Sequence, residues 1–317
     1  QPGMSNFGKL LMIQEIHFNN ISTSGILTAT APQILAVGYI LSMAGQDVTW
    51  GQWFAASMPI AILTLIASFV IGQLLFKSEV TTPPTTDLDH GQMSLKEQYK
   101  ALGKISANEI KALVIFFLTV FLWATDGKHL ELFGFQISLV MVAVFSAALF
   151  FLPYIGILSW KESNIPWDLM IFSCGAYAVG LALDASGAAS FLLNSIFERF
   201  DLEALSPFAL YMIIMFIASF SHLVFTSKNV RVVILLPAII LLANSLGINP
   251  VALALPACFT ICDSITLPPH CKPNLIFYSS GYFTVKDQFV YGMLVLFAKW
   301  LILGVAYFTW FRVVGIV

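Results

Sequence analysis

Long apolar runs separated by short polar stretches occupy most of the chain. The runs that predict continuous membrane-spanning helices are residues 54–76, 112–125, 137–158 and 288–310. A further apolar segment, 167–197, contains a turn near its middle. Repeated apolar runs of about 18 residues or more are typical of transmembrane helices, because a helix of that length crosses the hydrocarbon core of a bilayer. The pattern therefore predicts an all-α polytopic membrane protein.

The first interruption of the apolar pattern lies near the start of the chain. Residues 10–18 fit a helix, but polar residues follow at 19–25 and again at 28–33, where Pro32 stands among hydroxyl side chains. Proline lacks a backbone donor and clashes with the preceding turn, so it breaks the helical hydrogen bonds. We therefore predict a broken transmembrane helix here, followed by a turn at 45–47 and a continuous span.

Two further interruptions, residues 226–231 and 267–274, divide the last third of the chain. The apolar segments that flank the first of them, 207–225 and 232–244, are short, which predicts a re-entrant hairpin that returns to the same side of the membrane. The second interruption follows apolar residues 250–265 and predicts another broken helix. Non-helical backbone at membrane depth must line an enclosed cavity, and charges there are rare and usually functional. We expect the two interruptions to form half of a solute-binding site.

A weak internal repeat relates the two broken helices. Pro32-Gln33 parallels Pro273-Asn274, and residues 48–58 align without gaps to 283–293 with three identities in eleven positions. The two turns of the repeat fall on opposite sides of the membrane in this layout, which is typical of inverted-repeat secondary transporters. Only the second copy has a hairpin before its broken helix. We therefore expect an N-terminally truncated member with the first hairpin missing.

Composition supports this class of protein. Of 317 residues, 58% are hydrophobic and 10% are charged, and the mean hydropathy is +0.86, whereas soluble domains carry about 25% charged residues. The net charge of -2 gives no indication of a nucleic-acid partner. The four cysteines lie inside apolar segments, where we interpret them as small packed residues rather than as disulfides or metal ligands.

The distribution of basic residues predicts an orientation. If the polar segment 77–111 is cytoplasmic, eight basic residues lie on that side and three outside, in agreement with the positive-inside rule. Within this segment Ser94 and Glu97 fit a capping box at the start of an amphipathic helix over 94–102. That helix either lies along the membrane surface or is a soluble linker. We expect an integral protein of a bacterial inner membrane.

Three motifs, in this order along the chain, resemble the divalent anion/sodium symporter family. Residues 28–33 resemble the first break of that family. The tripeptide Ser-Lys-Asn at 227–229 stands where the family has Ser-Asn-Thr at the tip of a re-entrant hairpin. The tetrapeptide Cys-Lys-Pro-Asn at 271–274 stands where it has Thr-Pro-Pro-Asn. The resemblance covers nearly the whole chain and corresponds to the later two-thirds of the family.

The resemblance implies an elevator-type secondary transporter of small divalent anions, such as a dicarboxylate, sulfate or a similar oxyanion. It implies a homodimer in the lipid bilayer, with Na⁺ or H⁺ as the coupling ion and no cofactor. It also implies four regions: the end of the first repeat at 1–76, the cytoplasmic loop at 77–111, scaffold-like helices at 112–200 and the second-repeat transport region at 201–317. The residues it assigns to substrate binding are Thr28, Thr30, Ala31, Pro32, Ser227, Lys228, Asn229, Cys271, Lys272, Pro273 and Asn274.

The departures from the family pattern are cationic. Lys228 replaces an asparagine that, in the family, helps to hold sodium and substrate, so we hypothesise that its ammonium stands in for one sodium ion and makes transport sodium-independent at this half-site. Arg231, Asp263 and His270 are expected to balance charge around the site, with Arg231 either a structural partner of Asp263 or a ligand. Lys228 could instead anchor at the interface by snorkelling, and Lys299 is expected to face lipid headgroups in that way.

Other functions remain open at this point. The same family includes sodium-coupled dianion symporters, and the wider superfamily includes cation antiporters and arsenite-type permeases. A cation carrier would need a site rich in acids, and the basic residues argue against it. A membrane-embedded enzyme would need a nucleophile with a base or paired acids with a metal, and no such motif is present, so we do not expect an enzyme. A remnant without transport activity is a further alternative.

Overall fold

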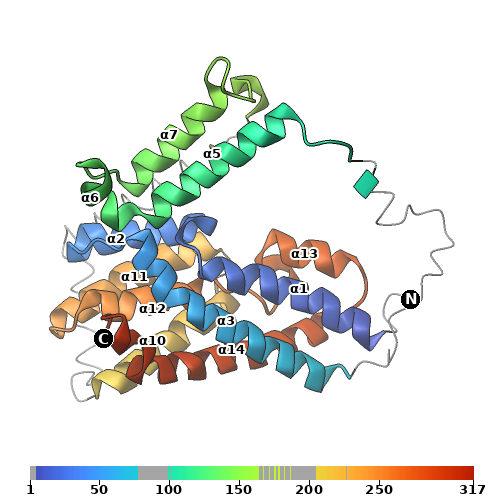
Figure 1. Ribbon diagram of the computed structural model, residues 1–317. Helices are drawn as coiled ribbons and strands as arrows, with labels where there is room; N and C mark the ends of the chain where they lie inside the picture. Colours follow the sequence, from blue (N-terminus) through green and yellow to red (C-terminus); the bar gives the residue numbers. More distant parts are fainter. Residues whose placement is uncertain are drawn as a thin grey trace. The chain divides into compact units, whose positions relative to one another are not determined.

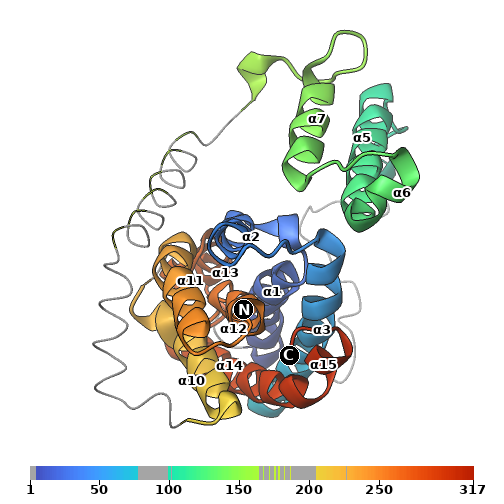
Figure 2. The same cartoon turned by 90° about the vertical axis from the view of Figure 1, so that its left-hand side faces the viewer.

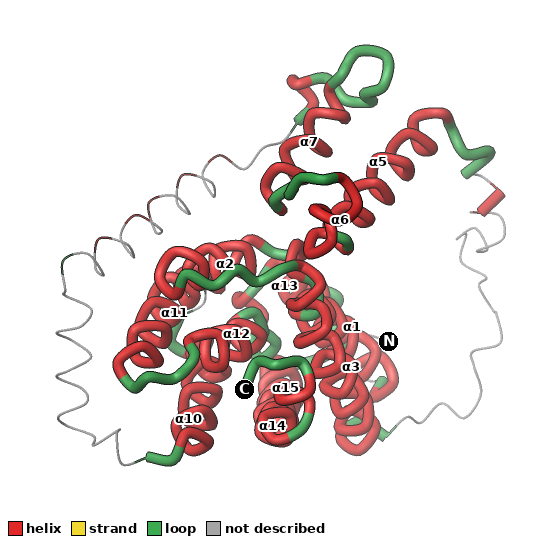
Figure 3. Tube along the Cα trace, turned by 60° about the vertical axis from the view of Figure 1, so that its left-hand side comes forward, coloured by secondary structure: helices red, strands yellow, loops and turns green. Residues whose placement is uncertain are grey.

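The computed structural model describes residues 5–77, 99–163 except 101, 205–317 except 226, and the isolated positions 167, 171, 175, 178, 182 and 186. All regular elements in these residues are helices (Figure 3). The chain divides into a large unit, residues 1–48, 52–79 and 167–317, and a small unit, residues 49–51 and 80–166. Four of the described helices, drawn with the others in Figure 1, are long and apolar enough to span a membrane.

The large unit begins with the first broken helix. Helix α1 (Asn6–Ser24) is followed by a short 3₁₀ helix, η1 (Leu27–Ala29), and by α2 (Ala31–Ala44), and the span α3 (Trp50–Leu75) comes next. The predicted break at residues 19–25 was wrong, because α1 continues to Ser24. Its polar residues suit a helix because the Thr23 and Ser24 hydroxyls donate to carbonyls one turn back, at 2.8 and 2.7 Å.

The predicted re-entrant hairpin consists of α10 (Pro207–Phe220), η5 (Ser221–Leu223) and α11 (Lys228–Ser245). Near the start of α10, the Tyr211 hydroxyl donates to the Leu303 carbonyl near the end of α14 (Val285–Phe308) at 3.2 Å. The C-terminal end of α11 is followed within a few residues by the helix Pro250–Ile261. Asn249 and Val251, at the start of that helix, line a cavity together with Val314, which follows α14. Both arms therefore open at the same end of the large unit.

The second broken helix comprises α12 (Pro250–Ile261), η6 (Pro268–His270) and α13 (Lys272–Ser279), and it precedes α14 and the short α15 (Trp310–Val313). Helix α12 ends four residues before the predicted end at 265. Helices α11 and α13 begin with lysine, at Lys228 and Lys272, slightly earlier than predicted. The capping residues Ser227 and Cys271 therefore put an ammonium group at the first position of each helix.

The internal repeat is confirmed by matching hydrogen bonds. The Gln33 side chain donates to the Thr23 carbonyl at 2.7 Å, and the Asn274 side chain donates to the Ser264 carbonyl at 2.6 Å, ten residues back in both copies. In the same way Trp53 donates to the Ser24 carbonyl at 3.1 Å. Gln288, which aligns with Trp53, donates to the Ile265 carbonyl at 3.0 Å. Each break is thus closed by an amide in the following helix and by a donor in the next span.

The two copies run in opposite directions. At one end of the large unit, Lys9 near the start of α1 pairs with Asp287 near the start of α14 at 3.3 Å. At the other end, Asp47 after α2 and Asn249 before α12 line one cavity. Figure 2 shows α1, α3, α10, α12 and α14 gathered into a single bundle. The turns that follow the two broken helices therefore lie at opposite ends, as an inverted repeat requires.

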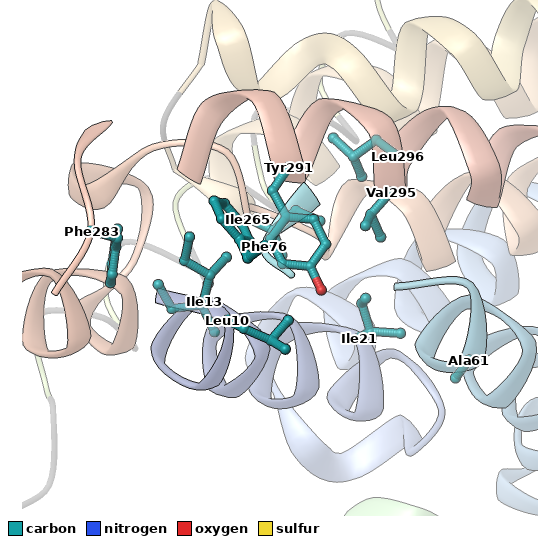
Figure 4. Packing of buried hydrophobic residues seen from close by; sticks show 11 residues of the cluster. Leu10, Ile13, Ile21, Ala61, Phe76, Ile265, Phe283, Tyr291, Val295 and Leu296 are labelled. Atoms are coloured by element: carbon teal, nitrogen blue, oxygen red, sulfur yellow. The ribbon is translucent and has the colours of Figure 1, made fainter. Parts of the chain in front are cut away.

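A buried apolar cluster joins the two copies. Leu10, Ile13 and Ile21 of α1 face Val295 of α14 and the ring of Tyr291 (Figure 4). The Tyr291 hydroxyl is satisfied inside this cluster, since it lies 2.6 Å from the Gln14 Oε1 atom and 2.7 Å from the Ser68 carbonyl. Because lipid is as apolar as these side chains, close packing and internal hydrogen bonds, rather than escape from water, stabilise such contacts.

The small unit contains α5 (Ala107–Ala124), η2 (Asp126–Lys128), α6 (His129–Phe133), α7 (Leu139–Phe151) and η3 (Trp160–Glu162). Helices α5 and α7 are joined by a buried hydrogen bond between the Thr119 and Ser146 hydroxyls at 2.7 Å. The predicted helix over 137–158 ends earlier, at Phe151. The predicted helices over 94–102 and 167–197 lie largely outside the described residues, and the division into scaffold and transport regions stays a prediction.

Candidate functional site

The tip of the hairpin meets the two broken helices at Lys228. Its ammonium donates to the Asn20 Oδ1 atom of α1 at 2.9 Å, and the Asn20 amide donates to the Asn274 Oδ1 atom of α13 at 3.1 Å. Three segments far apart in the sequence therefore share one chain of hydrogen bonds. The Lys228 side chain is half-buried and points into the protein, which excludes the interpretation that it snorkels to the membrane surface.

The orientation of each amide in this chain is fixed by its partners. The Asn274 Nδ2 atom donates to the Ser264 and Leu267 carbonyls in the second break, at 2.6 and 3.0 Å. Its Oδ1 atom must therefore accept, from Asn20 and from the Cys271 thiol, the latter at 2.9 Å. The Asn20 Nδ2 atom donates to Asn274, so the Asn20 Oδ1 atom is the one that faces Lys228. The site thus presents an acceptor to the ammonium.

The structure brings together some of the predicted substrate-binding residues. Lys228, Cys271 and Asn274 share the hydrogen-bond chain, with Asn20 as the link. Ser227 caps α11, accepting from the Val230 N–H at 3.4 Å. The remaining predicted residues are distributed along the breaks as follows: Thr28, Thr30, Ala31, Asn229 and Pro273 are half-buried, Pro32 is buried and Lys272 is exposed. Helix α11 packs against α2, which brings the hairpin arm beside the helix that follows the first break.

Asp263 has a partner that the sequence did not indicate. Its Oδ2 atom lies 2.5 Å from the ammonium of Lys299, and both side chains are almost completely buried, at 0% and 1% exposure. Lys299 also donates to the Phe259 carbonyl in the last turn of α12 at 2.8 Å. The expectation that Lys299 faces lipid headgroups was therefore wrong. The ion pair of Asp263 is therefore with Lys299, and its part in balancing the charges of Lys228 and Arg231 stays a prediction.

Arg231 is buried without a carboxylate. Its Nη2 atom donates to the Ser264 hydroxyl at 2.7 Å and lies 3.5 Å from the Asp263 carbonyl oxygen, and its Nη1 atom lies 3.5 Å from the Ser221 hydroxyl. In the described part of the chain, the ion pairs are Lys9–Asp287 and Lys299–Asp263 only. Arg231 thus contacts the Asp263 backbone rather than its side chain. A buried charge without a counter-charge is unfavourable unless dipoles or a ligand compensate it.

The two histidines at this point are packed against each other. His222 at the hairpin tip makes hydrogen bonds to the Ser219 carbonyl and the Thr266 hydroxyl, both at 2.7 Å, so both ring nitrogens have partners. Its ring lies 5.2 Å from that of His270 in an edge-on arrangement. His270 is 7% exposed, and its Nδ1 atom has no partner among the described residues. The role of His270 in charge balance stays a prediction.

The sequence did not point to Asn20, and Lys299 was assigned to the wrong environment. Asn20 stands in a polar stretch that we had interpreted as part of a break, so its position on a helix face was not apparent. Lys299 carried a usable signal, because a lone lysine inside an apolar span usually faces the protein interior and has a partner. Only the fold, however, identifies that partner, 36 residues earlier in the chain.

Two oppositely directed broken helices and a re-entrant hairpin that meet at a cationic point are the architecture typical of inverted-repeat secondary transporters. The chain matches the sodium:sulfate symporter transmembrane region over residues 2–317, and it belongs to that family. Together with the apolar spans, this makes it an integral membrane protein, as predicted.

Curated relatives include transporters of both coupling types. The chain is 27% identical to the human Na(+)/dicarboxylate cotransporter 3 over 96% of its length and 56% of the relative. It is 26% identical to the sodium-dependent dicarboxylate transporter SdcS of Staphylococcus saprophyticus, over 99% of the chain and 61% of the relative. The citrate/succinate antiporter of Escherichia coli K12 is 23% identical over the same shares, 99% and 61%. The chain thus spans less than two-thirds of the length of these relatives.

Proposed function

We propose that the protein is a secondary transporter of small divalent anions, a dicarboxylate or a sulfate-like oxyanion. The observation that carries this proposal is which charged side chains around the hairpin tip are paired and which are not. Lys299 and Asp263 neutralise each other, whereas Lys228 and Arg231 have no carboxylate partner in the part of the chain that the structure describes. Two positive charges favour a dianion electrostatically: Lys228 is placed to contact it, and the buried Arg231 attracts it at longer range.

The local backbone supports anion binding as well. Helices α11 and α13 both begin at the site, and both have lysine at their first position. The N-terminus of a helix carries free N–H groups and a partial positive charge, which favour an anion. Lys228 and Lys272 add full charges at these ends. We infer that the anion lies between the two helix ends, with Lys228 as its main ionic contact and Cys271 and Asn274 at its side.

We infer further that the site moves as one body, by an elevator-type displacement. Lys228, Asn20 and Asn274 join the hairpin, α1 and α13 by hydrogen bonds of 2.9 and 3.1 Å, so a relative movement of these segments would break the chain of bonds. Displacement of the whole group would preserve it. Assembly as a homodimer, which the family resemblance implies, belongs to the same proposal.

The coupling ion follows from the fixed positive charges of Lys228 and Arg231. Two unit charges 4 Å apart repel by about 4 kcal/mol at an effective dielectric constant of 20. A sodium ion beside either of these cations would meet that repulsion. We therefore propose anion exchange, or proton coupling, that is sodium-independent at this half-site. The alternative is sodium-coupled symport, which the names of two of the relatives favour.

Uptake by the protein reconstituted in liposomes tests this function. Labelled succinate, citrate and sulfate are supplied outside, with or without unlabelled dianion inside, in Na⁺ or in choline medium. We expect uptake that requires internal dianion and does not change when choline replaces Na⁺. A steep dependence on Na⁺ without any need for internal anion would establish the symport alternative. Absence of uptake for every dianion would contradict the proposal as a whole.

A further inference from the structure

The guanidinium of Arg231 is surrounded by oxygen atoms from two different segments. The Ser264 hydroxyl and the Asp263 carbonyl belong to the second break, at 2.7 and 3.5 Å, and the Ser221 hydroxyl belongs to the hairpin tip, at 3.5 Å. Arg231 itself is 0% exposed. A positive charge therefore links the hairpin to the break through neutral oxygens only. Such a set of oxygens around a cation is what a desolvated alkali-metal ion also requires.

The residues around this position do not fit an additional sodium ion. The oxygens nearest to the centre already face the guanidinium. On the other side of the break the ammonium of Lys299 binds the Asp263 Oδ2 atom at 2.5 Å and the Phe259 carbonyl at 2.8 Å, and the Asp263 Oδ1 atom has no hydrogen-bond partner among the described residues. A sodium ion would meet two fixed cations, each repelling it by several kcal/mol at such distances. The family to which the chain belongs is described by sodium coupling, so this is a specific disagreement.

The first break differs at the equivalent positions. Aligning Gln33 with Asn274 matches Ser22 and Thr23 to Asp263 and Ser264, and extending the alignment of α3 with α14 matches Thr64 to Lys299. All three residues of the first copy are neutral. The Thr23 and Thr64 hydroxyls are used locally, donating to carbonyls of their own helices at 2.8 and 2.7 Å. The charges are thus confined to the second copy, where the arginine lies.

We propose that Arg231 is a tethered cation that fills the cation position between the hairpin tip and the second break, so that sodium does not bind there. Lys228 has a separate role, because its ammonium extends past this position to Asn20 on α1. Only this second statement, that Lys228 serves the transported anion, rests on the proposed function. The first concerns the binding of a cation to the protein and holds whether or not the substrate has been identified correctly.

The test is whether removal of Arg231 creates a sodium site. Thermal unfolding of the purified protein in detergent is measured in NaCl and in choline chloride at equal ionic strength, without any dianion. For Arg231→Ala and Arg231→Gln we expect Na⁺ to raise the midpoint by about 3 °C or more beyond its effect on the wild type, since an ion that binds only the folded state stabilises it. Arg231→Lys, which keeps a tethered cation, is expected to behave as the wild type does.

Two controls make the result specific. Arg312→Ala removes an exposed arginine at the far end of the chain, 5.7 Å from the Phe308 ring, and is expected to leave the Na⁺ response unchanged. Lys228→Gln leaves the guanidinium in place and is expected to gain no Na⁺ response. The proposal is overturned if both neutral Arg231 variants respond to Na⁺ as the wild type does, or if Lys228→Gln alone gains the response. Because the assay contains no dianion and measures no transport, its failure is distinguishable from failure of the proposed function.

Discussion

The break in the first copy is closed by neutral groups, whereas the break in the second copy is surrounded by ionised side chains. Gln33 and Trp53 satisfy the carbonyls of the first break, and Asn274 and Gln288 do the same in the second. What differs is the addition of charges in the second copy only. Neutral donors are therefore sufficient to satisfy the backbone of a broken helix. The charged side chains around the second break must have a different role. The predictions below test whether that role is to bind the anion.

The largest effect is expected from breaking the buried ion pair. Lys299→Met leaves the Asp263 carboxylate buried without a partner, and removal of one member of a buried pair costs about 3–5 kcal/mol in the free energy of unfolding. The equivalent change in the first copy, Thr64→Ala, removes one hydrogen bond within a helix and is expected to cost about 1 kcal/mol or less. Thermal or denaturant unfolding in detergent measures both.

A double variant controls this result. Replacing both ion-pair residues, as in Asp263→Asn with Lys299→Met, removes both charges and is expected to recover much of the loss. If the single and double variants are equally stable, Lys299 and Asp263 do not compensate each other, and the assignment of paired and unpaired charges behind the proposed function is incorrect.

The second prediction concerns Lys228. Replacing it with glutamine removes a charged hydrogen-bond donor from the site, and such bonds contribute about 1.5–3 kcal/mol. We therefore expect the half-saturating dianion concentration to rise about 10- to 100-fold. Lys272→Gln is the matched control, because Lys272 occupies the equivalent first position of α13 but is exposed, and we expect a smaller rise. Equal effects of the two variants would contradict the special role of Lys228.

A third comparison uses the two amides that close the breaks. Asn274→Ala leaves the buried Ser264 carbonyl without its side-chain donor, and Gln33→Ala removes the shorter of two hydrogen bonds to the Thr23 carbonyl, so each is expected to lower the free energy of unfolding by about 1–3 kcal/mol. Only Asn274 also contacts Asn20 and Cys271. We therefore expect Asn274→Ala to weaken dianion binding as well, whereas Gln33→Ala changes stability alone. Unfolding midpoints and binding isotherms on the same preparations separate the two effects.

The smallest effect is expected at Asn20. Asn20→Asp has nearly the same shape, but it puts a carboxylate 2.9 Å from the Lys228 ammonium, which it neutralises, and it also removes the donor to the Asn274 Oδ1 atom. Dianion affinity should then fall by about tenfold, which corresponds to roughly 1.4 kcal/mol. Asn20→Gln, which retains a neutral amide, is the control for side-chain size. Dianion binding to Asn20→Asp that equals binding to the wild type would show that Lys228 is not the ionic contact.

Much of the fold was accessible from the sequence, because proline and clustered polar residues inside apolar runs have few structural interpretations. The hairpin and the second broken helix were predicted on that basis, and the repeat was predicted from matching residues in the two copies. The first break was misplaced, since Asn19 and the residues after it look like a helix end until their hydrogen bonds within α1 are known. A stretch of polar residues without proline at membrane depth can either continue a helix or end it.

The site was accessible only in part. Lys228, Cys271 and Asn274 follow from their place in the motifs, but the partner of Lys228 is 208 residues away, and no local pattern connects it with Asn20. The partner of Asp263 was misassigned for the same reason: Arg231 lies 32 residues before Asp263 and Lys299 lies 36 residues after it, so only packing decides between them. Long-range pairing of polar side chains is set by the assembled bundle rather than by spacing along the chain.

The central claim is that fixed positive charge at the hairpin tip holds a doubly negative solute. Calorimetric titration of the purified protein with succinate and with its singly charged half-amide, succinamate, tests it most directly, in Na⁺ and in choline media. Succinate is expected to bind at least about tenfold more tightly than succinamate, because succinamate lacks one of the two carboxylates that pair with the site. Both media are expected to give the same affinity. Equal affinity for the two compounds, or succinate binding that disappears in choline, would contradict the central claim.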